Sequence, residues 1–165
     1  RCLVDAGAKL ELTNDTGRTA LSLACESGNV DVVRRLVDAG ANLEATYGDG
    51  KTSLMCVSYY GHVNAVRCLV EAGANLDAPT NEGHTALMYA SHNGQMNTVR
   101  CLVDAGANLE VADDKGKTAL MRAINADRLD VSRFLVEKGA LRGAVVPELA
   151  LASGRPGSDD TKTPV

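Results

Sequence analysis

Tyrosines are the residues of this sequence whose type and placement point most clearly to a chemistry, and that chemistry is binding. Three of the four tyrosines, Tyr59, Tyr60 and Tyr89, lie in the middle of the chain. A tyrosine buries a large ring at low entropic cost and keeps a polar hydroxyl, so it is a favoured anchor in protein interfaces. The alternative is that one or two of these rings pack against neighbouring helices. We favour binding for the group and leave both interpretations open for each tyrosine.

The sequence offers little for catalysis. His62, His84 and His92 have no helix-spaced partner for a metal, and the chain has no glycine-rich phosphate loop and no local motif of a Ser, His and Asp set. Cys56 is the most accessible candidate among the thiols, although a structural cysteine is the simpler interpretation. We therefore predict that the chain is not an enzyme and uses no cofactor and no metal.

The tyrosines belong to a sequence that repeats every 33 residues. One set of glycines opens a motif in each unit, at Gly17, Gly50, Gly83 and Gly116, and another closes it, at Gly7, Gly40, Gly73, Gly106 and Gly139. A fixed period of this size is typical of a solenoid, in which each unit is too small to bury its own apolar face. Stacking of the units must then supply the core.

Two motifs inside the unit resemble a known family. The pattern G-x-T-A-L-M-x-A resembles the T-P-L-H-x-A signature of the ankyrin repeat, and L-V-x-A-G-A resembles the end of that repeat's second helix. The resemblance covers residues 1 to 140. It implies an all-α repeat solenoid, an ankyrin-repeat stack of helix-turn-helix units with β-hairpin-like finger loops. It also implies a concave groove, lined by the first helices and the fingers, that usually binds proteins.

Capping residues and glycines in the sequence predict where each unit and its helices begin and end. Full units are expected at residues 9–41, 42–74, 75–107 and 108–140, after the C-terminal half of a truncated unit at 1–8. In the first full unit Thr19 predicts the start of a helix over 20–27 that ends at Gly28, and a second helix over 30–39 ends at Gly40. A degenerate capping helix is expected over 141–154 and a disordered tail over 155–165.

Two columns of leucines are expected to join unit to unit, Leu21, Leu54, Leu87 and Leu120 on the first helices and Leu36, Leu69, Leu102 and Leu135 on the second. Other columns vary from unit to unit. Three of these share one face of the first helix at i, i+3 and i+4, and contain Leu23, Cys56, Tyr89 and Arg122, then Glu26, Tyr59, His92 and Asn125, then Ser27, Tyr60, Asn93 and Ala126. By the resemblance this face and the fingers line the groove. The predicted protein-binding residues are Tyr47, Cys56, Tyr59, Tyr60, His84, Tyr89, His92 and Arg122.

The units depart from the family pattern at several positions. The family's proline is replaced by Ala20, Ser53, Ala86 and Ala119, and its histidine by Ser22, Met55, Met88 and Met121. In the family that histidine ties neighbouring units together, so we expect this array to depend more on packing. Asp127 replaces a glycine and Ser132 replaces a valine found in the other units. We therefore expect the fourth unit to be the weakest.

A ladder of arginines recurs on the second helices at Arg1, Arg34, Arg67, Arg100 and Arg133, and an acid follows each after four residues, at Asp5, Asp38, Glu71, Asp104 and Glu137. A basic stripe would suggest phosphate binding. Because an acid lies one helical turn from each arginine, we instead expect compensated ion pairs on a solvated face, each contributing a few tenths of a kcal/mol.

Net charge and cysteine content restrict the kinds of partner and the cellular location that we expect for this protein. The net charge of −4, from 17 basic and 21 acidic residues, disfavours nucleic acid and anionic membranes, and no apolar run approaches the roughly 18 residues that span a bilayer. Cys2, Cys68 and Cys101 recur at one position of the unit, but helices packed about 8–10 Å apart hold cysteines too far apart for a disulfide. Free thiols favour a reducing, cytoplasmic location, with the nucleus left open.

Three functions remain open. The leading hypothesis is a monomeric, non-catalytic module that binds a partner protein through the concave groove. Because the chain begins within a unit, the alternative is the targeting or autoinhibitory arm of a larger enzyme, such as a kinase or ubiquitin ligase, whose catalytic domain precedes Arg1. The third is a structural spacer. Thr163-Pro164-Val165 also fits the loose pattern of a PDZ-domain ligand, although an ordinary terminus is the simpler interpretation. The sequence does not identify the partner.

Overall fold

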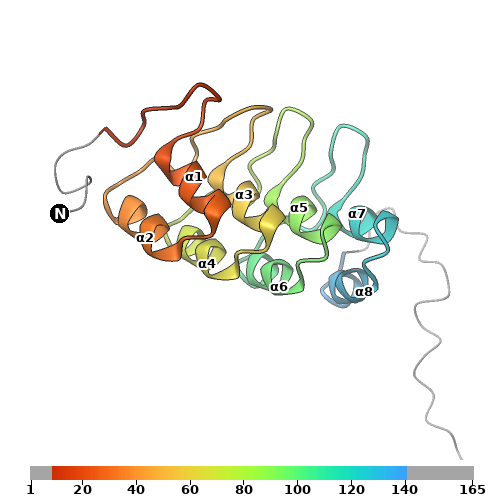
Figure 1. Ribbon diagram of the computed structural model, residues 1–165. Helices are drawn as coiled ribbons and strands as arrows, with labels where there is room; N and C mark the ends of the chain where they lie inside the picture. Colours follow the sequence, from red (N-terminus) through yellow and green to blue (C-terminus); the bar gives the residue numbers. More distant parts are fainter. Residues whose placement is uncertain (1–8, 141–165) are drawn as a thin grey trace, which may run out of the picture.

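The computed structural model describes residues 9–140, in which eight helices form two parallel rows (Figure 1). The inner row contains α1 (Ala20–Ser27), α3 (Ser53–Tyr60), α5 (Ala86–His92) and α7 (Ala119–Asn125), and the outer row contains α2 (Val30–Asp38), α4 (Val63–Glu71), α6 (Met96–Asp104) and α8 (Leu129–Glu137). Each inner helix packs on the outer helix that follows it, and each row packs side by side. The predicted all-α repeat solenoid is confirmed.

Threonines define where the inner helices begin. Thr19, Thr52, Thr85 and Thr118 precede the four helices, and each side-chain oxygen accepts a hydrogen bond from the amide three residues later. Such a cap satisfies one of the free amides of the first turn. At the other end of α1 and α3, Gly28 and Gly61 adopt left-handed conformations with φ of 69° and 78°. The two helices predicted in the first unit match α1 and α2 to within one residue.

The core contains the two predicted leucine columns. The inner-row leucines Leu21, Leu54, Leu87 and Leu120 are each 1 % exposed, and the outer-row leucines Leu36, Leu69, Leu102 and Leu135 are at most 5 % exposed. Each buried leucine contributes roughly 1.5–3 kcal/mol relative to an exposed one. Met55 and Met88, which replace the family's histidine, are also buried in this core. Neighbouring units are therefore joined mainly by aliphatic packing.

One side chain from each later unit reaches back over the unit before it. His62 Nε2 lies 3.2 Å from the carbonyl oxygen of Glu26, Gln95 donates to the carbonyl of Tyr59 at 3.4 Å, and Arg128 donates to that of His92 at 3.1 Å. These carbonyls lie in the last turns of α1, α3 and α5, where the helix itself supplies no donor. The three side chains thus contact carbonyl groups that would otherwise lack a partner at the helix ends of the preceding units.

The same three side chains explain the glycines beneath them. A Cβ atom on Gly28, Gly61 or Gly94 would collide with the side chain of the next unit, and each glycine has a positive φ. Asp127 occupies the fourth equivalent position with a φ of 54°, and it is exposed. An aspartate in this left-handed region is strained relative to glycine. This strain agrees with the expectation of a weaker fourth unit, which remains a prediction.

The second departure in the fourth unit is compensated locally. The hydroxyl of Ser132 donates to the carbonyl oxygen of Leu129 at 3.0 Å. The neighbouring Val131 has no exposed surface, whereas Val32 at the same position of the first unit is 41 % exposed. The position of Val131 is buried in the second and third units as well, as Ala65 and Thr98, so α8 keeps this buried position while Ser132 replaces the buried valine beside it.

A polar ladder joins the units along the loops, and the sequence analysis missed it. Glu11, Glu44 and Asp77 each accept a hydrogen bond from the backbone amide 31 residues later, at Asn42, Asn75 and Asn108, over 2.8–3.0 Å. The asparagine side chains in turn accept from the amides of Glu44, Asp77 and Glu110. The signal was present in the sequence as Asn-Leu-acid, which recurs in the second, third and fourth units.

The loops that precede the inner helices project as fingers (Figure 1). In the second finger, Tyr47 and Lys51 form an antiparallel bridge with bonds of 3.0 and 3.1 Å, which confirms the hairpin-like form. Successive fingers are also tied together, because Asn81 donates to the carbonyl of Asp49 at 2.9 Å and Asp114 to that of Glu82 at 3.1 Å. The second, third and fourth fingers therefore form one connected edge.

The predicted ion pairs of the arginine ladder are wrong. Among the described residues, no ladder arginine forms an ion pair with the acid four residues later. Instead Arg100 lies over the ring of Phe134 at 4.6 Å, and the positive charge of Arg67 acts on the Cys101 thiol, where it partly opposes the rise in pKa caused by burial. Each of these partners comes 34 residues later, on the neighbouring outer helix, so packing between units outweighs the weak pairing within one helix.

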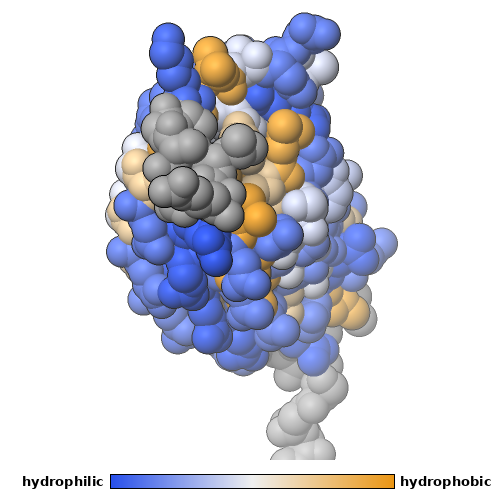
Figure 2. All heavy atoms as spheres, turned by 60° about the vertical axis from the view of Figure 1, so that its left-hand side comes forward, coloured by the Kyte–Doolittle hydropathy of each residue, from blue (hydrophilic) through white to orange (hydrophobic). Residues whose placement is uncertain are grey.

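The remaining surface is mainly hydrophilic. Figure 2, which brings the α1 side of the molecule forward, shows apolar residues only in small patches among hydrophilic ones. The exposed large apolar residues of the described chain are Leu12, Leu23, Val32, Tyr59, Tyr60 and Leu129. The half-unit at 1–8 with Arg1 and Cys2, the capping helix over 141–154, the tail over 155–165 and its PDZ-type terminus lie outside the described residues.

Candidate functional site

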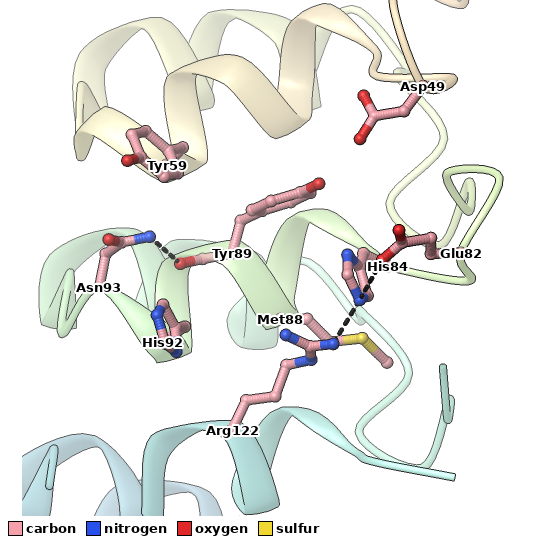
Figure 3. A pocket seen from close by; sticks show the side chains of 9 residues that line it. All are labelled: Asp49, Tyr59, Glu82, His84, Met88, Tyr89, His92, Asn93 and Arg122. Carbon is pink, nitrogen blue, oxygen red and sulfur yellow. Dashed lines mark hydrogen bonds and ion pairs between the residues drawn. The ribbon is translucent and has the colours of Figure 1, made fainter. Parts of the chain in front are cut away.

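A groove runs between the fingers and the inner helices, and it contains two adjoining pockets. We call the first the histidine pocket, of about 260 Å³, and it is lined by Asp49, Tyr59, Glu82, His84, Met88, Tyr89, His92, Asn93 and Arg122 (Figure 3). We call the second the tyrosine pocket, of about 250 Å³, and it is lined by Arg18, Glu26, Tyr47, Lys51, Met55, Cys56, Tyr59, Tyr60 and Tyr89. Tyr59 and Tyr89 border both pockets, so the two form one continuous surface.

Aromatic rings form a row along this groove. The ring centres of Tyr60 and Tyr59 are 5.0 Å apart, those of Tyr59 and Tyr89 are 6.3 Å apart, and those of Tyr89 and His84 are 5.7 Å apart. All three pairs meet edge to face, the geometry that the ring quadrupoles favour. Tyr59 and Tyr60 nevertheless remain 47 % and 46 % exposed. The rings therefore support one another without burying the surface that a partner would need.

Charged side chains cover part of the tyrosine pocket. The guanidinium of Arg18 lies 5.0 Å from the ring centre of Tyr47 and pairs with the carboxylate of Glu26. The ammonium group of Lys51 lies 5.7 Å from the ring centre of Tyr89. Two of the four tyrosine rings in this pocket thus already contact cations of the chain itself.

Tyr47 and Cys56 form the floor of the tyrosine pocket. Cys56 is only 6 % exposed, so the expectation that it carries the most accessible thiol is wrong; Cys101 is more exposed. Burial raises the pKa of the Cys56 thiol, and burial together with a hydrogen bond to Cys56 raises that of Tyr47. Both groups are neutral at physiological pH, and Cys56 therefore supports the groove from beneath.

The described cysteines are all free thiols. Cys25, Cys56, Cys68 and Cys101 form no disulfide, as predicted. Burial raises the pKa of Cys25 to about 12 and raises the pKa values of Cys68 and Cys101 above their usual range. Protonated thiols are poor nucleophiles. These cysteines act as small core residues in this fold.

A buried aspartate organises the histidine pocket. The side chain of Asp113 is 1 % exposed and accepts hydrogen bonds from the amides of Lys115 and Lys117 at 2.8 and 2.9 Å. Arg122 donates to Asp113 through Nε at 3.1 Å and through a terminal nitrogen, and the same terminal nitrogen contacts His84 Nε2. Figure 3 shows Arg122 extending from α7 towards His84.

The protonation states of this cluster follow from its contacts. Burial alone would raise the pKa of Asp113, but the amides of Lys117 and Lys115 and the guanidinium of Arg122 hold it below its usual value. Burial and Arg122 lower the pKa of His84 below 6.5. At pH 7, therefore, Asp113 is charged and His84 is neutral, with Nε2 able to accept a hydrogen bond from Arg122.

Asp113 is not among the predicted site residues, although the sequence carries a signal for it. Asn14, Thr80 and Asp113 occupy the same position before their finger tips, and each side chain accepts a hydrogen bond from an amide of its own loop. Asn, Asp and Thr commonly stabilise turns in this way. The contact of Asp113 with Arg122 could not be foreseen, because it depends on how the finger folds over α7.

The structure brings all eight predicted site residues into this groove. Tyr59, Tyr60, Tyr89 and His92 lie on the inner helices, Tyr47 and His84 belong to the fingers, and Arg122 extends from α7. Cys56 lies beneath them. Asp49, Glu82 and Lys51 also line the pockets, although they are not among the predicted binding residues.

The stacked helix pairs and projecting fingers define a helical-repeat solenoid, a class that presents extended surfaces for binding. A family model described as ankyrin repeats (3 copies) matches residues 1–80 and 57–143. The chain therefore belongs to the ankyrin-repeat family, and the resemblance seen in the sequence is confirmed. Ankyrin repeats are generally protein–protein interaction modules and are typically non-catalytic. The comparison with curated protein sequences finds no match.

Two further observations concern the described part of the chain alone. None of its helices is both long and apolar enough to cross a membrane. Residues 9–140 also contain no group of three or more His, Cys, Asp and Glu side chains placed to hold a metal ion.

Proposed function

We propose that this protein is a non-catalytic module that binds a partner protein through the groove between its fingers and inner helices. The observation that carries the proposal is the aromatic row, in which Tyr59 and Tyr60 remain about half exposed while their edge-to-face contacts hold them in place. Large rings with few rotatable bonds lose little entropy when they are buried at an interface. The protein acts as a monomer in this proposal.

The groove is already ordered before a partner binds. The fingers are tied to one another through Asn81 and Asp114, and the inner helices are fixed by the buried leucine columns. A surface that is already ordered loses little conformational entropy when a partner docks. We also propose a reducing, cytoplasmic location, because the described cysteines are unpaired.

The test compares proteins captured from cell lysate by three forms of the chain. The first is the unchanged chain, the second carries Tyr59→Ala, Tyr60→Ala and Tyr89→Ala, and the third carries Val32→Ala and Leu129→Ala. The third form is the control, because it also truncates exposed apolar side chains but lies outside the groove. We expect partners that the first and third forms capture and the second loses. An identical set for all three would contradict the groove assignment.

Single substitutions refine this test once a partner is captured. We expect Tyr59→Ala and Tyr89→Ala each to weaken binding by more than about 1 kcal/mol, because interface anchors are mostly large rings. Titration calorimetry measures the affinity, and urea denaturation measures the free energy of unfolding. If a substitution lowers stability by as much as it lowers binding, that tyrosine is a packing residue and not an anchor.

A further inference from the structure

We infer that the histidine pocket receives a basic side chain, specifically an arginine, from the partner protein. The inference rests on the proposed function, because it names the chemistry of the partner at the same groove. Its basis is the combination of two exposed carboxylates, two aromatic rings and an already neutralised guanidinium in one small pocket.

The carboxylates belong to successive fingers. The side chains of Asp49 and Glu82 are 48 % and 64 % exposed, and the bond from Asn81 to Asp49 holds their two fingers together. Within residues 9–140 the only ion-pair contact of the Glu82 carboxylate is with His84, at 3.7 Å. Since His84 is neutral at pH 7, the charge of Glu82 is not compensated there.

The guanidinium that lines the pocket does not offset these charges. Arg122 donates two hydrogen bonds to Asp113, whose side chain is 1 % exposed, so this pair is close to neutral as a unit. Lys51 lies 3.4 Å from Asp49 and offsets part of its charge, so the carboxylate of Glu82 contributes most of the remaining negative charge of the pocket. A cation is favoured there and an anion is disfavoured.

The rings add a second attraction for a cation. Tyr59 and Tyr89 border the pocket, and Figure 3 shows the hydroxyl end of Tyr89 directed towards Asp49. The chain itself supplies a precedent, because the Lys51 ammonium lies 3.4 Å from a carboxylate oxygen of Asp49 and 5.7 Å from the centre of the Tyr89 ring. A carboxylate and a tyrosine therefore already hold one cation at the edge of this pocket.

Size and donor chemistry favour arginine. The pocket volume of about 260 Å³ lies below the range of roughly 300–1,000 Å³ for small-molecule sites, so it suits a single side chain. An arginine can stack its planar guanidinium on a ring while its N–H groups donate to carboxylates. The tyrosine pocket is less suitable, because its one lining carboxylate, Glu26, already pairs with Arg18.

The first test uses N-acetylarginine amide as the probe. N-acetylcitrulline amide is the control, because citrulline has nearly the same shape but no charge. Nuclear magnetic resonance follows the backbone amides of the full chain during titration. We expect the arginine probe to shift the amides of Tyr59, Glu82 and Tyr89, with smaller shifts at higher salt. Equal shifts from the two probes, or shifts located elsewhere, would overturn the inference.

A matched pair of variants tests whether the carboxylate of Glu82 binds the arginine probe. We expect Glu82→Gln to weaken binding of the arginine probe by about threefold, a typical value for an exposed charge pair. Asp15→Asn should leave it unchanged, because Asp15 is an exposed acid on the first finger and lines neither pocket. Unchanged binding in both variants would refute the assigned role of Glu82 and with it the arginine site.

Failure of the inference and failure of the proposed function give different results. If the probe does not bind but the tyrosine variant still loses its captured proteins, the groove binds a partner and only the arginine site is wrong. If the probe binds but all forms capture the same proteins, the pocket has the inferred chemistry and the proposed function of the groove fails.

Discussion

At the residue scale, the groove depends on side chains whose partners lie in other units. His84 on the third finger contacts Arg122 on α7, which is held by Asp113 on the fourth finger. Arg18 on the first finger lies over Tyr47 on the second. Because the contacts of His84 with Arg122 and of Arg18 with Tyr47 each span two units, a change at one of these residues is expected to alter the alignment of neighbouring fingers as well as the local surface.

The histidine makes stability depend on pH. His84 faces Arg122, Asp113, Glu82 and Lys115, and its folded pKa is lowered below 6.5. The unfolded chain therefore binds more protons in this range, so the contribution of His84 is complete above about pH 6.5 and is lost as the pH falls through its folded pKa. We expect the free energy of unfolding to decrease between about pH 7.5 and pH 5.5.

Urea denaturation across this range measures the effect, with His84→Gln as the variant and His92→Gln as the control. His92 is exposed and forms no ion pair among the described residues. The His84 variant should show a shallower decrease than the unchanged chain, and the control should follow the unchanged chain. A variant at position 84 with an unchanged pH profile would contradict this assignment. Asp113 adds a further loss at lower pH, because its folded pKa is also lowered.

At the element scale, each inner helix begins at a threonine cap, but the connection between paired helices depends on the next unit. Gly28, Gly61 and Gly94 combine a positive φ with close approach of a side chain from the following unit. Asp127 keeps the positive φ and is exposed. The connection between α7 and α8 therefore retains the backbone strain of a left-handed residue without the glycine that would relieve it.

Replacing that aspartate should stabilise the fold. We expect Asp127→Gly to raise the free energy of unfolding by about 0.5–1 kcal/mol, because glycine adopts a positive φ without steric cost. Urea denaturation at neutral pH measures the change. Gly61→Ala is the opposing control, since its Cβ would collide with Gln95 and its φ is 78°, and it should destabilise the protein. A destabilising Asp127→Gly would show that the aspartate side chain makes a compensating interaction.

At the scale of the whole molecule, the array is a row of units that contact only their neighbours. Its stability therefore resides in the interfaces formed by the leucine columns, by the Asn-Leu-acid ladder and by the fingers. The groove extends across several of these interfaces, so its shape depends on all of them being formed. Loss of one interface would separate the histidine pocket from the units on one side.

A core substitution in the third unit tests this organisation. Leu102 has no exposed surface, and we expect Leu102→Ala to lower the free energy of unfolding by about 2–5 kcal/mol. Hydrogen exchange with mass spectrometry should show the largest loss of protection in α5 to α8, with α1 and α2 less affected. Equal loss throughout the chain would indicate that the array opens as one cooperative unit.

The sequence by itself determined the period, the helices and the two leucine columns, because caps, glycine stops and apolar spacing act locally and recur in every unit. It also predicted a shared face for Tyr59, Tyr89, His92 and Arg122, which the structure places along one pocket. Only the tertiary structure decided their roles. It buried Cys56 beneath Tyr47, directed Arg100 onto Phe134 instead of its own helix, and placed Asp113 against Arg122. The first and third of these contacts join a finger to the inner helix of its own unit, and the second joins two units. All three depend on how loops and helices pack and not on spacing along one helix.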